Sequence, residues 1–132
     1  MKANELMVGD WVMDGGVAAR VTSLTCDGII ETTHSISNIE VVEPIPLTAD
    51  ILEKNGFQYT NCHTLKGAGT YVLRLEQRGF DFGITIKLHN YFALDSYDDR
   101  MYCLAALQTG KWYVHELQHA LLLCGIEKEI IL

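Results

Sequence analysis

The sequence predicts an α+β fold: a small SH3-like β-barrel at residues 1–46, then an antiparallel sheet packed by a C-terminal helix at residues 47–132. Three observations lead to this prediction. Short β-prone segments separated by glycine turns dominate the first part. A regular alternation of apolar and polar residues fills the middle of the chain, which is typical of strands. Apolar residues recur with a helical period at about residues 112–124.

The first part contains four or five short predicted strands, separated by turns at residues 14–16 and 26–28. One of these strands covers residues 29–32. The last one ends at Pro44 and Pro46, because proline cannot donate a hydrogen bond to a β-ladder. So many short strands in 46 residues favour a small, strongly curved sheet of the SH3-like kind.

A short connector helix is expected to begin after Thr48, whose hydroxyl can accept a hydrogen bond from the first turn. Asp50 lies in that turn, where the helix dipole favours a carboxylate. Gly56 can adopt the left-handed conformation that ends many helices. Ile51 and Leu52 are expected to face inward. This helix joins the two predicted parts of the chain.

The alternation at residues 71–88 predicts an antiparallel meander with one buried face. Leu73 and Leu75, for example, alternate with Arg74, and the pattern resumes after a turn near Gly79. The remaining predicted elements are a polar connection at 95–100, a strand at 101–107, the helix around His115 and a final strand at 129–132.

The composition limits the classes of function. The formal net charge is −7, with 17 acidic and 10 basic residues, and the basic residues are scattered singly, which disfavours nucleic-acid binding. The first residues lack the apolar region of a signal peptide, and no segment is long and apolar enough for a spanning helix. A cytoplasmic protein is therefore expected. Four widely spaced cysteines predict buried, reduced side chains: Cys26, Cys62, Cys103 and Cys124.

The sharpest functional motif is His115-Glu116-x-x-His119, the H-E-x-x-H spacing of many zinc peptidases. Residues four apart lie on one face of an α-helix, so both imidazoles can face one zinc ion. Glu116 would then polarise the zinc-bound water as a general base. The motif therefore indicates a zinc-dependent hydrolase as one candidate function.

The missing third zinc ligand weighs against this function, because a catalytic zinc ion needs three protein ligands. The extended zincin pattern is absent, since Leu122 and Gly125 occupy the positions of its glycine and third histidine. No spacing rule supports the upstream histidines His34, His63 or His89 as the third ligand.

The helical phase favours a structural role for the same segment. At 100° per residue, one apolar stripe gathers Val114, Leu117, Ala120, Leu121 and Cys124. His115 and His119 fall nearly opposite this stripe. We therefore expect a helix docked on the sheet, with its histidines toward solvent.

Three segments carry a family resemblance: NELMVGDWV at 4–12, EPIPLTADILEKNGF at 43–57 and VHELQHALLLCGIEKEI at 114–130. They resemble a family of small uncharacterised proteins of Bacteroides-type bacteria and their prophages and mobile elements. In that family the segments tend to read N-x-L-R-x-G-N-W-V, E-P-I-P-L-T-x-x-I-L-x-K-x-G-F and V-H-Q-L-Q-N. Gln and Asn thus replace Glu116 and His119. The resemblance implies a structural or interaction role for the helix, with H-E-x-x-H as a local variant.

The leading hypothesis is a non-enzymatic accessory or protein-interaction protein of phage or mobile-element origin, with an unknown protein partner. It assigns no catalytic, cofactor-binding or metal-binding residue, and it expects no cofactor, nucleic acid or membrane. The first alternative is a zinc-dependent metallopeptidase or hydrolase that uses His115, Glu116 and His119. The second is a nucleic-acid-binding barrel, which the net charge of −7 disfavours.

Overall fold

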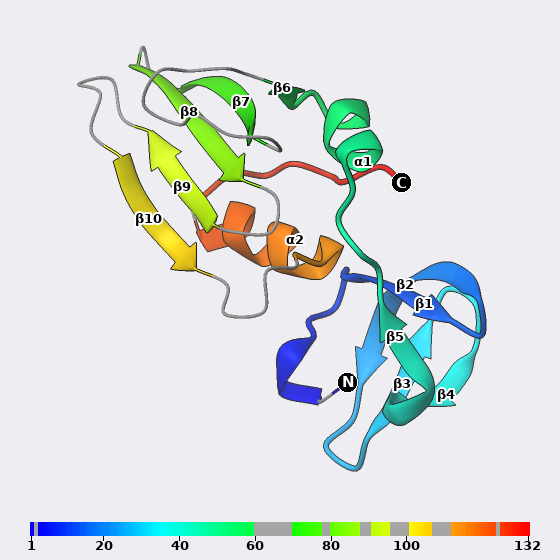
Figure 1. Ribbon diagram of the computed structural model, residues 1–132. Helices are drawn as coiled ribbons and strands as arrows, with labels where there is room; N and C mark the ends of the chain where they lie inside the picture. The colour runs from blue at the N-terminus through cyan, green and yellow to red at the C-terminus, as the bar shows by residue number, and fades with distance from the viewer. Residues whose placement is uncertain are drawn as a thin grey trace. The chain divides into compact units, whose positions relative to one another are not determined.

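The computed structural model (Figure 1) describes residues 1, 3–59, 70–77, 80–87, 91–95, 101–106, 112–123 and 125–132. The described elements include two five-stranded antiparallel sheets and a C-terminal helix, so the predicted α+β class is confirmed. The chain divides into two compact units. Unit 1 comprises Met1–Pro46 and Tyr113–His119, and unit 2 comprises Leu47–Trp112 and Ala120–Leu132.

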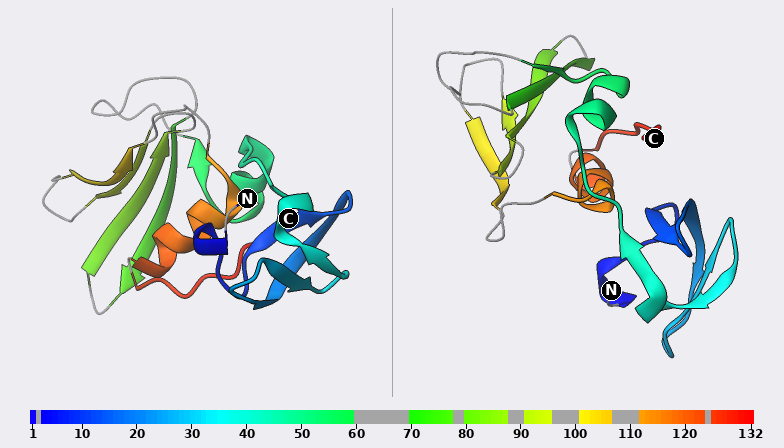
Figure 2. Two further views of the ribbon diagram at one scale, coloured as in Figure 1. Left: turned by 90° about the horizontal axis from the view of Figure 1, so that it is seen from below. Right: turned by 45° about the vertical axis from the view of Figure 1, so that its right-hand side comes forward.

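Unit 1 is built on a sheet with the strand order β4-β3-β2-β1-β5, shown from two further sides in Figure 2. Its elements are η1 (Ala3–Glu5), β1 (Trp11–Asp14), β2 (Val17–Leu24), β3 (Ile29–Thr32), β4 (Ile36–Asn38), η2 (Ile39–Val41) and β5 (Val42–Pro44). Strands β4 and β5 are the two edges of this sheet and do not pair with each other. The sheet is thus not closed into a barrel, and the SH3-like barrel stays a prediction.

The hairpin between β1 and β2 shows how the turn chemistry sets the strand register. Asp14 pairs with Val17 across a two-residue loop. Gly15 and Gly16 in this loop have φ angles of 59° and 82°, the left-handed values that a type I′ turn requires at both positions. The glycine pair expected from the sequence therefore fixes which residues of β1 face the core.

The core of unit 1 is a cluster of buried aliphatic side chains from four strands, from η2 and from the segment before β1: Leu6, Val12, Val21, Ile30, Ile39 and Val42. Met1 and Leu24 pack against this cluster and are partly buried. The alternating burial of β1 and β3 matches a sheet with one face turned to the core.

A buried carboxylate joins the ends of three strands in unit 1. The side chain of Asp14 accepts hydrogen bonds from the hydroxyls of Thr32 at 2.7 Å, Ser35 at 2.8 Å and Ser37 at 3.1 Å. The hydrogen bond from Thr32 is the main cause that lowers the pKa of Asp14, and it is opposed by burial. The ionised carboxylate is therefore part of the folded structure.

Unit 2 contains the second sheet, with the strand order β10-β9-β8-β7-β6. Its strands are β6 (Gln58–Tyr59), β7 (Thr70–Gln77), β8 (Phe80–Lys87), β9 (Tyr91–Asp95) and β10 (Met101–Ala106). The meander predicted for residues 71–88 is present, and Tyr71 and Leu73 are buried as its alternation requires. The predicted turn at 78–79 and residues 96–100 of the polar connection lie outside the described residues.

Helix α1 (Ala49–Lys54) has the predicted punctuation. The hydroxyl of Thr48 accepts a hydrogen bond from the backbone N–H of Ile51 at 3.3 Å. Gly56 follows the helix with a φ of 88°, and Leu52 is fully buried. The signals read from the sequence therefore act locally, as helix caps should.

The final strand predicted at residues 129–132 is wrong. The backbone there pairs with a side chain: the amide group of Asn55 donates to the carbonyl of Ile131 at 2.7 Å, and its oxygen accepts from the Ile131 N–H at 2.8 Å. Lys54 also donates to the carbonyl of Leu132 at 2.7 Å. One side-chain amide thus replaces the strand partner, which a sequence pattern does not reveal.

Helix α2 (Val114–Leu123) lies within the range expected from the helical period. Gly125 follows it with a φ of 71°, and its N–H donates to the carbonyl of Leu122 at 2.9 Å. No helix in the described part of the chain is long and apolar enough to cross a membrane.

Candidate functional site

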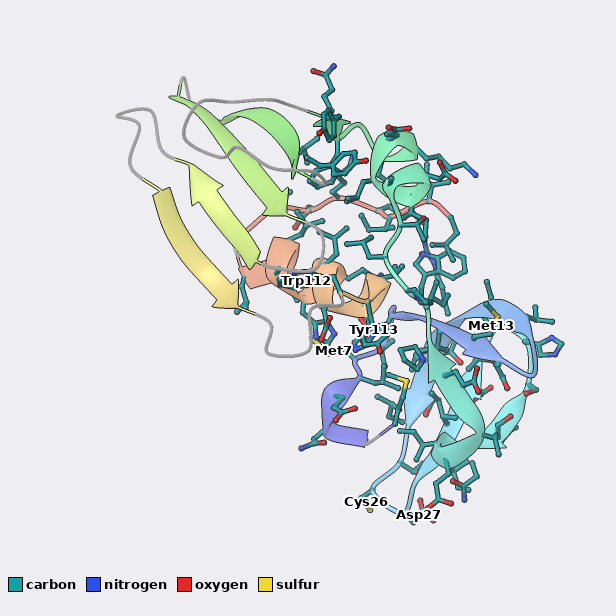
Figure 3. All side chains as sticks on the ribbon, in the orientation of Figure 1. Met7, Met13, Cys26, Asp27, Trp112 and Tyr113 are labelled. Carbon is teal, nitrogen blue, oxygen red and sulfur yellow. The ribbon has the colours of Figure 1, made fainter. Side chains whose placement is uncertain are left out.

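The start of α2 is fixed within unit 1 by backbone hydrogen bonding. The N–H of Val114 donates to the carbonyl of Ile45 at 2.9 Å, and Tyr113 forms an isolated antiparallel bridge with Pro46. Val114 and Leu117 are fully buried, as the apolar stripe predicted. The backbone at the start of α2 is therefore fixed in place, and so are the positions of the polar side chains on its first turns (Figure 3, where Tyr113 is labelled).

Glu116, the residue that the motif assigns as general base, has a structural partner. Its Oε2 accepts a hydrogen bond from the backbone N–H of Tyr113 at 2.9 Å. This is the reach of a glutamate at the third helical position back to the residue before the helix, which forms one half of a capping box. The carboxylate therefore satisfies a backbone donor that the helix itself leaves without a partner.

Gln118, which the sequence analysis did not single out, holds the segment that enters β1. Its Oε1 accepts from the N–H of Trp11 at 2.9 Å, and its Nε2 donates to the carbonyl of Gly9 at 3.0 Å. One side-chain amide thus satisfies two backbone groups of residues 9–11. A glutamine inside a helix gives no sequence signal of this role.

His119 contacts Asp10, the residue between Gly9 and Trp11. Its Nε2 lies 2.7 Å from Oδ2 of Asp10, which is itself buried. The same Oδ2 accepts from the N–H of Met7 at 2.7 Å. The side chain of His119 is 28% exposed. Asp10 was also missed by sequence reasoning, because the contact joins residues 109 positions apart.

His115 corrects the expectation that both histidines face solvent: it is only 5% exposed. The apolar stripe alone suggested an open face, but Asn4 and Glu5 of the N-terminal segment line the same pocket as this histidine. Burial is the main cause that lowers the pKa of His115, opposed by the charge of Asp10, so the neutral ring is favoured at pH 7. Its Nδ1 is buried and has no hydrogen-bond partner among the described residues.

Three rings follow one another along the start of α2. The rings of Tyr113 and His115 are stacked, with centroids 6.0 Å apart and an interplanar angle of 11°. His115 and His119 meet edge to face, with centroids 5.7 Å apart. The ring of His115 is therefore packed between the other two rings.

A pocket of about 400 Å³ opens beside these rings, within the volume range of ligand sites. It is lined by Met1, Asn4, Glu5, Pro44, Tyr113, His115, Glu116 and His119. Two of the lining side chains are carboxylates. The Asp10–His119 pair adds no net charge or one negative charge, depending on whether the histidine is protonated. The lining residue Met1 also carries the N-terminal ammonium, so these groups together have a net charge of −1 or −2, and the pocket is acidic in both cases.

In the part of the chain that the structure describes, His115 and His119 have no third candidate ligand beside them that completes a metal site. Within the described ranges, no three His, Cys, Asp or Glu side chains are grouped so that they could hold a metal ion. His34 lies near the carboxylate of Asp14, and the predicted third-ligand candidates His63 and His89 fall outside the described residues. Cys26 is exposed, not buried as expected.

The polar groups of the pocket lining are the carboxylates of Glu5 and Glu116, the amide of Asn4, the hydroxyl of Tyr113 and the imidazoles of His115 and His119. Comparison of the chain with protein-family models, with curated proteins and with solved structures found no match. Function is therefore inferred from the geometry of unit 1 itself.

Proposed function

We propose that this chain is a non-enzymatic accessory protein that binds a protein partner through unit 1. The observation that supports this proposal is that two polar residues of the H-E-x-x-H motif already make structural contacts. Glu116 caps α2 and His119 is bonded to Asp10, so both fasten the helix within unit 1. The acidic pocket beside them remains as the feature that a partner can enter. An SH3-like relationship of residues 1–46 and an origin in bacterial prophages or mobile elements belong to the same proposal.

The zinc-hydrolase alternative requires two structural contacts to break: the one between Glu116 and the Tyr113 N–H, and the one between His119 and Asp10. A tetrahedral zinc ion bound by an imidazole and a carboxylate holds their N and O atoms about 3.4 Å apart. Nε2 of His119 and Oδ2 of Asp10 are only 2.7 Å apart, which is a hydrogen bond with no room for an ion. Glu116 would also have to leave the Tyr113 amide to reach a zinc-bound water. The nucleic-acid alternative is disfavoured by the net charge of −7 and the acidic pocket.

Selection from a phage-displayed library of random peptides, with the full chain immobilised, tests this proposal. We expect enrichment of peptides that share a sequence pattern and compete with one another for binding in solution. A second immobilised protein of similar negative charge serves as the control for non-specific capture.

Failure to enrich any shared pattern would contradict the proposal. Peptide cleavage after addition of zinc would contradict it as well, if it disappears in Glu116→Gln. The glutamine keeps an oxygen that can accept from the Tyr113 N–H, so this variant removes the general base and preserves the helix cap.

A further inference from the structure

We infer that the pocket of unit 1 recognises the guanidinium group of an arginine side chain on the partner; the inference rests on the protein-binding function proposed above. Three features of the described residues carry it. They are an imidazole nitrogen without a partner, an acidic lining and a stacked pair of rings.

The buried nitrogen of His115 is the feature that most needs a ligand. A buried polar atom without a hydrogen bond destabilises a protein, so few are retained. The ring is 5% exposed and favours its neutral form, because burial disfavours the charged one. With its proton on Nε2, the neutral ring presents a lone pair at Nδ1. His115 lines the pocket, so a ligand that displaces the atoms covering Nδ1 and donates a hydrogen bond there would satisfy it.

The charge of the pocket indicates that this ligand is a cation. Glu5 reaches the pocket from η1, and Glu116 reaches it from the first turn of α2. The buried carboxylate of Asp10 stands behind His119, and its pair with that histidine is neutral or negative. Two carboxylates in a partly enclosed site attract a positive group and repel phosphates and acidic peptides.

The arrangement of acceptors and rings favours guanidinium over other cations. Arginine has five N–H donors and no acceptor, and its planar group stacks on aromatic faces. One face of the Tyr113 ring stacks on His115, at an interplanar angle of 11°. Tyr113 lines the pocket, so a planar cation would stack on its other face. The ammonium of lysine is a compact point charge without a plane to stack. A metal ion would have to separate His119 from Asp10, which are bonded at 2.7 Å.

Titration of the full chain with three capped tripeptides tests the inference, with two-dimensional amide NMR as the readout. The peptides have Gly-X-Gly sequences in which X is arginine, citrulline or lysine; citrulline keeps the shape of arginine without its charge. We expect saturable binding of the arginine peptide, with the largest shifts at residues 4–5 and 113–119. The citrulline and lysine peptides should bind at least about tenfold more weakly.

Two variants and a matched control separate loss of the site from loss of the fold. Glu5→Gln and His115→Phe should each weaken arginine binding by about tenfold or more. Phenylalanine keeps a ring beside Tyr113 and removes the unsatisfied nitrogen, so the melting temperature should stay equal or rise. Glu40→Gln makes the same charge change at an exposed position of unit 1 and should leave binding unchanged.

Equal affinity for arginine and citrulline, or for arginine and lysine, would overturn the inference. Unchanged binding in both pocket variants, or displacement of the arginine peptide by one equivalent of zinc, would overturn it as well. If library peptides bind without any dependence on arginine, the arginine site fails and the interaction function stands. If no library peptide binds, both fail.

Discussion

Replacing Leu117 with alanine is expected to lower the free energy of unfolding by about 2–5 kcal/mol. The side chain is fully buried in the first half of α2, the part of the helix that belongs to unit 1. Removing most of a buried leucine loses its transfer free energy and leaves a cavity that the surroundings fill only partly. Urea unfolding, followed by circular dichroism, measures the change.

Leu122 provides a matched control on the same helix. Its side chain is 56% exposed, so the same leucine-to-alanine change there should alter the unfolding free energy by less than about 0.5 kcal/mol. Similar losses of unfolding free energy at both positions would show that α2 does not bury the side with Leu117 and expose the side with Leu122.

Replacing Asp14 with alanine should lower the free energy of unfolding at pH 7 by about 3 kcal/mol. The change deprives the hydroxyls of Thr32, Ser35 and Ser37 of their common acceptor. Thr32 is buried and Ser35 and Ser37 are half-buried, so the loss of a charged acceptor is only partly made up by water or by their remaining hydrogen bonds. Alanine at the exposed Asp27, in the turn at 26–28 (Figure 3), is the control and should have little effect.

The contribution of Asp14 to the free energy of unfolding should also depend on pH. Hydrogen bonds, that from Thr32 above all, hold the pKa of the folded carboxyl below its ordinary value of 3.8. Its contribution to stability is therefore complete above pH 3.8 and is lost as the pH falls through the folded pKa. The difference in unfolding free energy between wild type and Asp14→Ala should shrink below about pH 4. A difference that stays constant down to pH 2 would contradict this role of the carboxylate.

Local features of this fold could be predicted from the sequence because short-range chemistry determines them. The turn at Gly15 and Gly16 needs two left-handed residues, and the cap at Thr48 needs a hydroxyl three residues before its donor. Whether the first sheet closes into a barrel was not predictable in this way. It depends on whether β4 and β5 meet, and no local pattern encodes that contact.

The H-E-x-x-H spacing located the candidate site in the sequence but did not show what its residues do in the structure. The capping role of Glu116 acts over three residues, but Tyr113 is not a Ser or Thr, so the usual capping-box pattern is absent. The partners of Gln118 and His119 lie more than 100 positions away, at residues 9–11. The helical phase placed His115 opposite the apolar stripe and could not show that the N-terminal segment lines the same pocket.

The zinc content of the chain tests most directly whether His119 and Glu116 hold the structure together or form a catalytic metal centre. Protein made without a histidine tag is grown with added zinc, dialysed and assayed by elemental analysis. We expect far less than one zinc per chain, because Asp10 occupies Nε2 of His119 and the Tyr113 amide occupies Glu116. One zinc per chain that is lost in His119→Asn would contradict this account.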